Sequence, residues 1–342
     1  MSYAKLANLP PINGLYTLVL PSAFYAFFGS SMILAVGPVA IVGLLMGQLV
    51  TEYGIEPQSK EAVEFAGEVS IAVGTIMLIL SVVNFGNVIR FVSFPVMSAF
   101  TTAAAWTIGM SQVGNAFNLK AAPKLGQTNY HYNYEVMNWY PSNFYSRDKE
   151  GHELNNSNAY NITFAVYFPL IFITLLRYYI PLTKAQKNTW WFKLFNFLGA
   201  LSPLIAVIIA ANVTWRIKTS ENMNFNESSL SIVGPVPPGV DFIKAPVYNY
   251  DFGKVIQDVL AMTLIAFMES YSVARRLAIE RNEVSILNAS QEMWANSIAN
   301  FMSGISSGFV ISGSYSRSAL NAISGAKTPI SKVVTMVRIH SI

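Results

Sequence analysis

The chain has 342 residues, of which 53% are hydrophobic and only 12% are charged, and its formal net charge is +4. A soluble domain has about 25% charged residues, so this composition excludes an ordinary soluble enzyme and indicates a membrane protein. The small net charge gives no reason to expect a nucleic-acid partner, and the lack of cysteine in this sequence excludes disulfides and thiolate metal sites.

Long stretches without any charged side chain divide the sequence. Each of them reaches or exceeds the roughly 20 residues that a transmembrane helix needs. They are residues 15–51, 69–89, 91–119, 154–176, 194–215 and 293–316. The sequence therefore predicts an all-α, polytopic protein that lies in a lipid bilayer, either the plasma membrane or an endomembrane.

The expected helices alternate with two kinds of connection. We expect helices at residues 15–28, 38–50, 69–83, 95–113, 161–180, 194–213, 255–274, 289–304, 316–324 and from 331 onward. Every second connection is short and basic, and these are predicted to be cytoplasmic because Lys and Arg favour that side. Their basic residues are Arg90, Arg177, Lys184, Lys187, Lys193, Arg275, Arg276, Arg281, Lys327 and Lys332. The opposite connections, of mixed charge, are residues 51–68, 115–160 and 216–251.

The first uncharged run is too long for one ordinary span and contains signals for a break. Gly29 and the two serines after it offer a turn, and Gly37 stands before Pro38 where a helix would be deep in the bilayer. Proline suits the first position of a helix. We therefore expect Pro38 to open a half-helix, although the same pair of residues is also compatible with a simple kink.

A second interrupted segment has the sequence SGSYSRSALNAISGAKT, residues 312–328, and contains one arginine. A charge at membrane depth costs roughly 3 kcal/mol, so Arg317 should face a cavity or a partner rather than lipid. Ser314, Tyr315 and Ser316 precede it at an expected helix start, where free N–H groups also favour an anion. The segment thus predicts an anion site, and the alternative is an arginine that reaches the lipid headgroups.

One carboxylate lies within a predicted membrane helix. Glu269 stands in AMTLIAFMESYSVA, with no basic residue before Arg275. Intramembrane ionisable residues are commonly functional, so we expect Glu269 to take up a proton when a divalent anion binds nearby. A structural carboxylate paired with Arg275 or Arg276 is the other interpretation.

Two interrupted helices in corresponding positions of two halves are typical of secondary transporters, in which irregular backbone at membrane depth lines a cavity. Motifs for covalent or nucleotide chemistry are absent from the sequence, which has no Walker A, GxSxG or HExxH pattern. The three histidines His131, His152 and His340 are scattered. We therefore expect no enzyme activity, no cofactor and no metal site.

Several strings resemble one known family in order and spacing. They are MSYAKLANLPPINGLYT, FGSSMILAVGPVAIVGLLMG, RFVSFPVMSAFTTAAAWTIGMSQ, ESYSVARRLA and SGSYSRSALNAISGAKT. Nearly the whole chain is thereby similar to the SulP family of sulfate permeases and related anion exchangers. The resemblance implies a seven-plus-seven inverted-repeat fold and a homodimer, with a core domain that moves against a gate domain.

The resemblance also implies which residues face the substrate. The anion would lie between the starts of the family's third helix, which Pro38 opens, and its tenth helix. Tyr3 would belong to the first helix and Glu269 to the eighth. The substrate-facing residues of the tenth helix would be Ser314, Tyr315, Ser316 and Arg317.

The chain departs from the family pattern at three places. From the resemblance we expect the chain to begin inside the family's first helix, without a glutamine that the family uses in the site. We likewise expect it to stop within the eleventh helix, before the family's last three helices and its cytoplasmic STAS domain. Ser290, Gln291 and Glu292 stand where the family usually has Asn-Gln-Glu. We therefore expect residues 1–342 to form a truncated SulP-type transmembrane domain.

The expected function is secondary active transport of sulfate or a similar inorganic anion by alternating access, coupled to protons. A chloride/bicarbonate or oxalate exchanger is one alternative, which a lack of pH dependence through Glu269 would favour. A non-transporting membrane remnant or motor-like relative is another, which would bind anions without flux. A permease for neutral nucleobases is disfavoured, because such a substrate needs no fixed cation like Arg317.

Overall fold

The structure is a computed structural model that describes residues 1–86, 252–323, 325–326 and 328–334, with eight single positions between residues 99 and 212. The chain divides into two compact units, residues 1–108 with 233–342, and residues 109–232. All described helices and strands below belong to the first unit. The helices expected at 95–113, 161–180 and 194–213 lie outside the described residues, apart from those single positions.

The described elements are mostly helical, as the sequence predicts. In chain order they are α1 (Ser2–Leu6), α2 (Asn13–Phe28), β1 (Ala35–Gly37), α3 (Ala40–Glu52), α4 (Lys60–Val82), α10 (Phe252–Glu280), α11 (Ala289–Ile305), β2 (Ser312–Ser314) and α12 (Tyr315–Ile323). Residues 330–334 are also helical, at the start of the segment expected from 331 onward.

Two helix ends differ from the prediction. Helix α4 begins at Lys60 rather than at residue 69, and the Ser59 hydroxyl caps it by accepting a hydrogen bond from the N–H of Ala62 at 3.0 Å. Helix α10 continues to Glu280 rather than ending at residue 274, so Arg275 and Arg276 lie in a helix and not in a connection. Charged side chains mark where a helix leaves the apolar layer, but its backbone stays hydrogen-bonded beyond that point.

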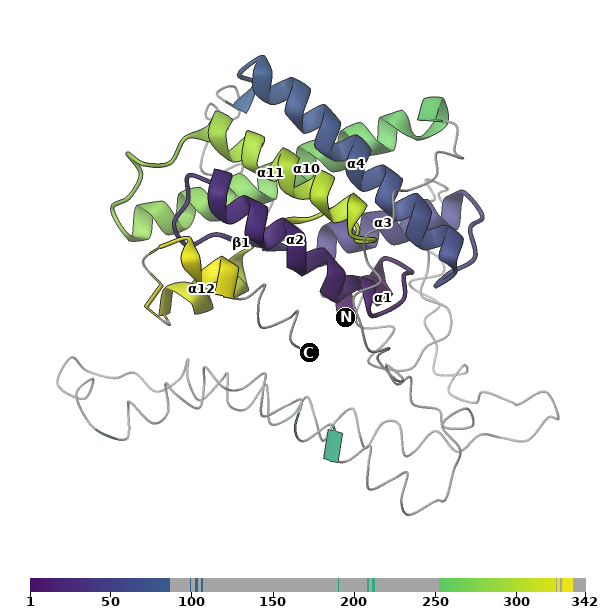
Figure 1. Ribbon diagram of the computed structural model, residues 1–342, viewed down its shortest axis with the longest axis horizontal. Helices are drawn as coiled ribbons and strands as arrows, with labels where there is room; N and C mark the ends of the chain where they lie inside the picture. Colours follow the sequence, from purple (N-terminus) through teal and green to yellow (C-terminus); the bar gives the residue numbers. More distant parts are fainter. Residues whose placement is uncertain are drawn as a thin grey trace. The chain divides into compact units, whose positions relative to one another are not determined.

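Helix α11 lies between α2 and α4 (Figure 1). Small residues allow these helices to pack closely. A Cβ atom on Gly74 would come within 2.9 Å of the Ser297 carbonyl oxygen, and one on Gly304 within 2.5 Å of the Gly67 carbonyl oxygen. The Ser297 hydroxyl donates to the Gly74 carbonyl at 2.7 Å. Small residues and interhelical hydrogen bonds are typical of helix contacts in membranes.

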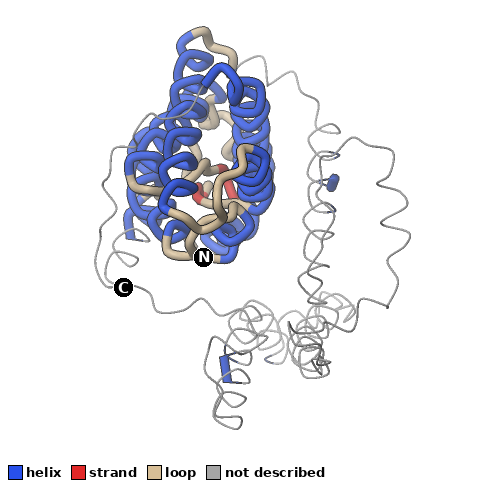
Figure 2. The backbone as a smooth tube through the Cα atoms, turned by 90° about the vertical axis from the view of Figure 1, so that its right-hand side faces the viewer, coloured by secondary structure: helices blue, strands red, loops and turns tan. Residues whose placement is uncertain are grey.

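The all-α prediction did not include a short antiparallel sheet. Strands β1 and β2 pair with Ala35 opposite Ser314, Val36 opposite Gly313, and Gly37 opposite Ser312. Figure 2 shows these strands, in red, among the helices. Strand β2 comes directly before α12, and β1 ends two residues before the N-cap residue of α3. In these segments the chain has left helical geometry, and its backbone groups need partners. The two interrupted segments supply these partners to each other.

Candidate functional site

The helical break within the first uncharged stretch, residues 15–51, is wider than a kink. Helix α2 ends at Phe28 and α3 begins at Ala40, so residues 29–39 separate them. Pro38 is not the first helical residue as predicted, because Val39 takes the N-cap position with extended backbone (φ −131°, ψ 158°). Pro38 instead comes directly before the N-cap residue, and its carbonyl oxygen is available as a hydrogen-bond acceptor.

Arg317 lies in the first turn of α12 and reaches this carbonyl group. Its Nη1 donates to the Pro38 oxygen at 2.8 Å, which joins the starts of the two half-helices. The Nε and Nη2 atoms are buried and have no hydrogen-bond partner among the described residues. A buried unsatisfied donor costs about 1–3 kcal/mol, and more when it is charged. A guanidinium that leaves two neighbouring donors open is suited to an oxyanion.

Glu269 lies near Arg317 without a direct ion pair between these two described residues. The carboxyl group interacts electrostatically with Arg317, while the nearby Ser312 hydroxyl donates to the Ala266 carbonyl at 2.8 Å. The second carboxyl oxygen, Oε2, is buried without a partner among the described groups. The predicted alternative, pairing with Arg275 or Arg276, is not found, because Arg276 pairs with Glu280 at 3.4 Å and no described ion pair joins Glu269 to either arginine.

The other predicted site residues divide into two groups. Tyr3, in α1, is close enough to interact electrostatically with Arg317. Ser314 is buried at the end of β2. Tyr315 is 41% exposed and its ring lies 4.8 Å from the guanidinium of Arg276, on α10. Ser316 is exposed, and its hydroxyl lies 3.3 Å from that of Ser314. Tyr3 and Ser314 therefore lie closer to the buried part of the site.

Sequence reasoning missed the polar side chains that hold the segment before α12. The N–H of Gly313 donates to the Ser270 hydroxyl at 2.7 Å, and this hydroxyl donates to Asn296 Oδ1 at 3.0 Å. The N–H of Ile311 donates to Asn300 Oδ1 at 2.9 Å. The sequence contained a pattern that could have predicted these contacts, because Asn296 and Asn300 are four residues apart and so share one face of α11.

A buried carboxylate on the same helix was also missed. Glu292 accepts hydrogen bonds from the Tyr25 hydroxyl at 2.6 Å, from the Ser30 hydroxyl at 2.7 Å, and from the N–H groups of Ser30 and Ser31 at 2.8 Å. Lys332 donates to the Ser31 carbonyl at 2.8 Å, with its ammonium 4.5 Å from the Tyr25 ring. In the sequence Glu292 resembles an ordinary first-turn acid, and Lys332 resembles an exposed loop residue. The structure buries both.

The sequence matches the sulfate permease family over residues 1–342. The chain belongs to this family. Together with its structural neighbours, this makes it a multi-pass membrane protein. Length and composition alone mark one described helix, Lys60–Val82, as able to cross a membrane, and Ala40–Glu52 is a shorter apolar helix.

Relatives with sequence similarity are named as sulfate transporters. The chain is 31% identical over 337 residues to sulfate transporter 4.1, chloroplastic, of Arabidopsis thaliana, which covers 98% of this chain and 44% of the relative. It is 28% identical over 340 residues to high affinity sulfate transporter 1 of Stylosanthes hamata, covering 98% and 46%. The chain thus spans about half of the length of these relatives.

Solved structures share the fold. The murine solute carrier 26 family member A9 anion transporter, in the inward-facing state, superposes with a TM-score of 0.74 at 17% identity, covering 99% of this chain and 53% of that one. The transmembrane domain of the cyanobacterium bicarbonate transporter BicA gives 0.69 at 16% identity, covering 99% and 76%. At such low identity the likeness concerns the fold alone.

Proposed function

We propose that the chain forms the anion-translocating part of a secondary active transporter for sulfate or a similar inorganic anion. The observation that carries the proposal is Arg317, a buried guanidinium tied by one nitrogen to the Pro38 carbonyl and left with two open donors. The names of the sulfate transporters among its relatives support the choice of substrate. In this proposal the anion is bound by Arg317, Tyr3, Ser314 and Ser316.

The transport cycle is proposed to be alternating access in a seven-plus-seven inverted-repeat fold, with residues 1–342 in one transmembrane domain. The antiparallel pairing of β1 with β2, each followed by a half-helix, supports an inverted relation between two halves of the chain. An anion held between two half-helix starts also gains from their unpaired N–H groups. No contribution to catalysis of a chemical step is proposed for any residue.

Proton coupling is proposed to run through Glu269. The Oε2 atom of Glu269 is buried without a partner among the described groups, and the carboxyl group interacts electrostatically with Arg317. This supports a coupling in which the carboxyl group and the guanidinium influence each other without an ion pair. A protonated Glu269 leaves the full charge of Arg317 available for an incoming dianion. When the proton leaves, the carboxylate competes with the anion, and release becomes easier.

The lipid bilayer and a second copy of the chain are the proposed partners of the outer surface. Near the end of α4 the side chains of Ile79, Val82 and Val83 are 58%, 71% and 72% exposed. Exposed apolar side chains of this kind suit lipid contact. The homodimer follows from the family resemblance.

The test of the proposed function is sulfate uptake into proteoliposomes that contain Arg317→Ala or Arg317→Lys. We expect the alanine variant to lose saturable uptake, and the lysine variant to recover a part of it, because an ammonium lacks the planar fork of the guanidinium. Lys60→Ala, at the exposed start of α4, is the control and should transport normally. Unchanged uptake kinetics in Arg317→Ala would contradict the proposal, and sulfate binding without any flux would favour the non-transporting alternative.

A further inference from the structure

A cavity extends from Arg317 toward the C-terminal end of α12. Its volume is about 250 Å³, and its wall includes β1, Ser22 of α2, Arg317 and Asn321 of α12, and Lys332 beyond that helix. Arg317 and Asn321 are four residues apart and so lie on one face of α12. The cavity therefore connects the proposed binding site with the segment that carries Lys332.

The wall of the cavity combines two cations with the apolar side chains of Leu18, Ala35, Val36 and Leu320. Its polar groups are Arg317, Lys332, the hydroxyls of Ser22 and Ser331, and the Asn321 amide, whose nitrogen already donates to the Ile33 carbonyl and the Ser331 hydroxyl. No described residue of the wall has a carboxylate. A cavity needs a volume of about 10–15 Å³ to hold one water molecule. The cavity thus has room for a small anion that keeps part of its hydration shell.

Lys332 is held in place, and its acidic neighbour does not face the cavity. The Ser31 carbonyl and the Tyr25 ring fix the ammonium group. Glu292 interacts electrostatically with Lys332, but the described donors around it already engage both of its carboxyl oxygens, and it is not part of the cavity wall. Lys332 therefore lines the cavity, and Glu292 does not.

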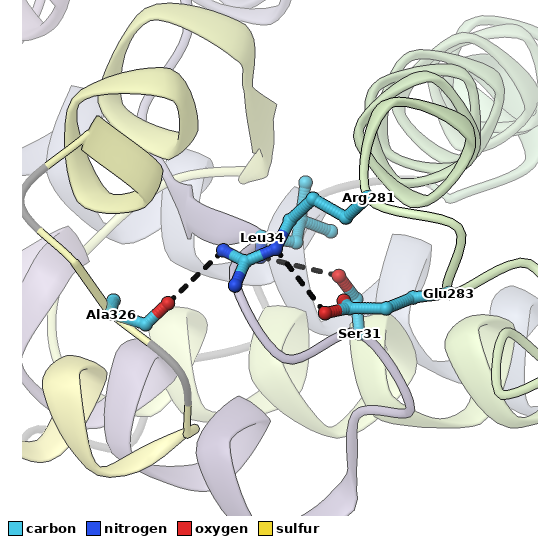
Figure 3. A network of polar contacts seen from close by, with 5 residues as sticks. All are labelled: Ser31, Leu34, Arg281, Glu283 and Ala326. Carbon is cyan, nitrogen blue, oxygen red and sulfur yellow. Dashed lines mark hydrogen bonds and ion pairs between the residues drawn. The ribbon is translucent and has the colours of Figure 1, made fainter.

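A second polar network holds the turn that precedes Lys332. Figure 3 shows Arg281, whose Nη1 donates to the Ala326 carbonyl at 3.1 Å and whose Nε lies 3.2 Å from the Glu283 carboxylate. The Ser31 hydroxyl, which accepts from the N–H of Leu34 at 3.2 Å, belongs to the same region. The connection after α12 is thereby fastened to the end of α10, which keeps the Lys332 end of the cavity in a defined geometry.

We propose that the Lys332 end of this cavity is a second anion subsite, which takes the same class of small inorganic oxyanion as Arg317. The inference rests on the proposed function, because an anion must move between Arg317 and one end of the molecule. A single ammonium with neutral hydroxyl groups binds an oxyanion more weakly than an open guanidinium fork. Such a subsite would concentrate anions beside Arg317 without trapping them.

The first test uses a single thiol in the cavity wall. Leu320 lines the cavity and is 54% exposed, and the chain has no cysteine, so Leu320→Cys adds one reactive group. In detergent-solubilised protein we expect inorganic sulfate to slow its modification by an anionic thiol reagent several-fold. Lys60→Cys, remote from the cavity, should show no protection by sulfate.

Protection has to be assigned to Lys332 rather than to Arg317. We expect it to persist in the Leu320→Cys protein with Arg317→Ala, to persist with Lys332→Arg, and to disappear with Lys332→Gln. Protection that requires Arg317 but not Lys332 would overturn the proposal, because the anion would then occupy the primary site alone.

A double variant separates anion binding from simple charge balance. If Lys332 only neutralises Glu292, then removing both charges with Glu292→Gln and Lys332→Gln should restore the sulfate protection. If Lys332 binds the anion, protection stays lost in the double variant.

The second subsite and the proposed function can fail separately. If sulfate uptake depends on Arg317 but sulfate protection does not depend on Lys332, the subsite is wrong and the proposed function stands. If sulfate protects the thiol but no uptake occurs, the subsite is supported and the proposed function is wrong.

Discussion

At the scale of single residues, the candidate site contains two charged side chains, Arg317 and Glu269, that interact electrostatically without forming a described ion pair. Arg317 has one described hydrogen bond, to Pro38, and Glu269 Oε2 is buried without a partner among the described groups. An unpaired charge at membrane depth costs free energy, so a residue that keeps such a charge is commonly functional. The sequence alone could indicate both residues, because each interrupts an uncharged stretch.

The first residue-scale prediction concerns Glu269→Gln in proteoliposomes with an imposed pH gradient. Wild-type sulfate uptake should rise as the external pH falls, because more carriers then hold the proton that accompanies a dianion. The glutamine side chain resembles the protonated acid permanently. The variant should therefore bind sulfate and exchange one anion for another, but lose accumulation driven by the pH gradient.

The matched control is Glu280→Gln, on the same helix but exposed and paired with Arg276. It should keep the pH dependence of the wild type. If Glu269→Gln also accumulates sulfate with unchanged pH dependence, Glu269 is structural, and the chloride/bicarbonate or oxalate exchanger becomes the better description.

At the scale of elements, the interrupted helices depend on side chains from α10 and α11. The sequence predicted where the chain leaves helical geometry, because glycine, proline and serine mark those places. It could not predict that β1 and β2 pair, since two three-residue strands have no periodicity of their own. Nor could it show which polar groups of α10 and α11 satisfy the backbone near Gly313, because those contacts join residues far apart in the chain.

An element-scale prediction follows for Asn300→Ala. The substitution removes the acceptor of the Ile311 N–H and leaves this buried group without its partner. We expect a loss of about 1–3 kcal/mol in stability, measured as a lower melting temperature in detergent. Thr75→Val is the control, because the Thr75 hydroxyl bonds only to the Ile71 carbonyl of its own helix. Equal melting temperatures for the two variants would show that the Asn300 contact contributes little.

At the scale of the described unit, the connections gather at two ends. At one end the N–H of Gln58 donates to the Asn8 carbonyl at 2.7 Å, between two segments far apart in the chain. At the other end Arg281 donates to Ala326, and Lys332 to the Ser31 carbonyl. The second end holds the described basic connections, which the sequence predicts to be cytoplasmic. The sequence predicts this side from charge, but it could not predict the burial of Lys332, which depends on Glu292 and Tyr25.

The last prediction tests this orientation with thiols placed at the two ends. Glu56→Cys lies in the exposed connection between α3 and α4, and Val284→Cys lies in the connection after α10, where Val284 is 48% exposed. The native chain contributes no thiol of its own. A membrane-impermeant thiol reagent should label Glu56→Cys in intact cells and Val284→Cys only after permeabilisation, because the positive charges around Arg281 and Lys332 favour the cytoplasm. Labelling of both positions from the same side would contradict the arrangement of the helices between them. Labelling in the reversed order would instead place the Lys332 end of the cavity outside the cytoplasm, and the proposed second subsite would then serve anion entry from the opposite side.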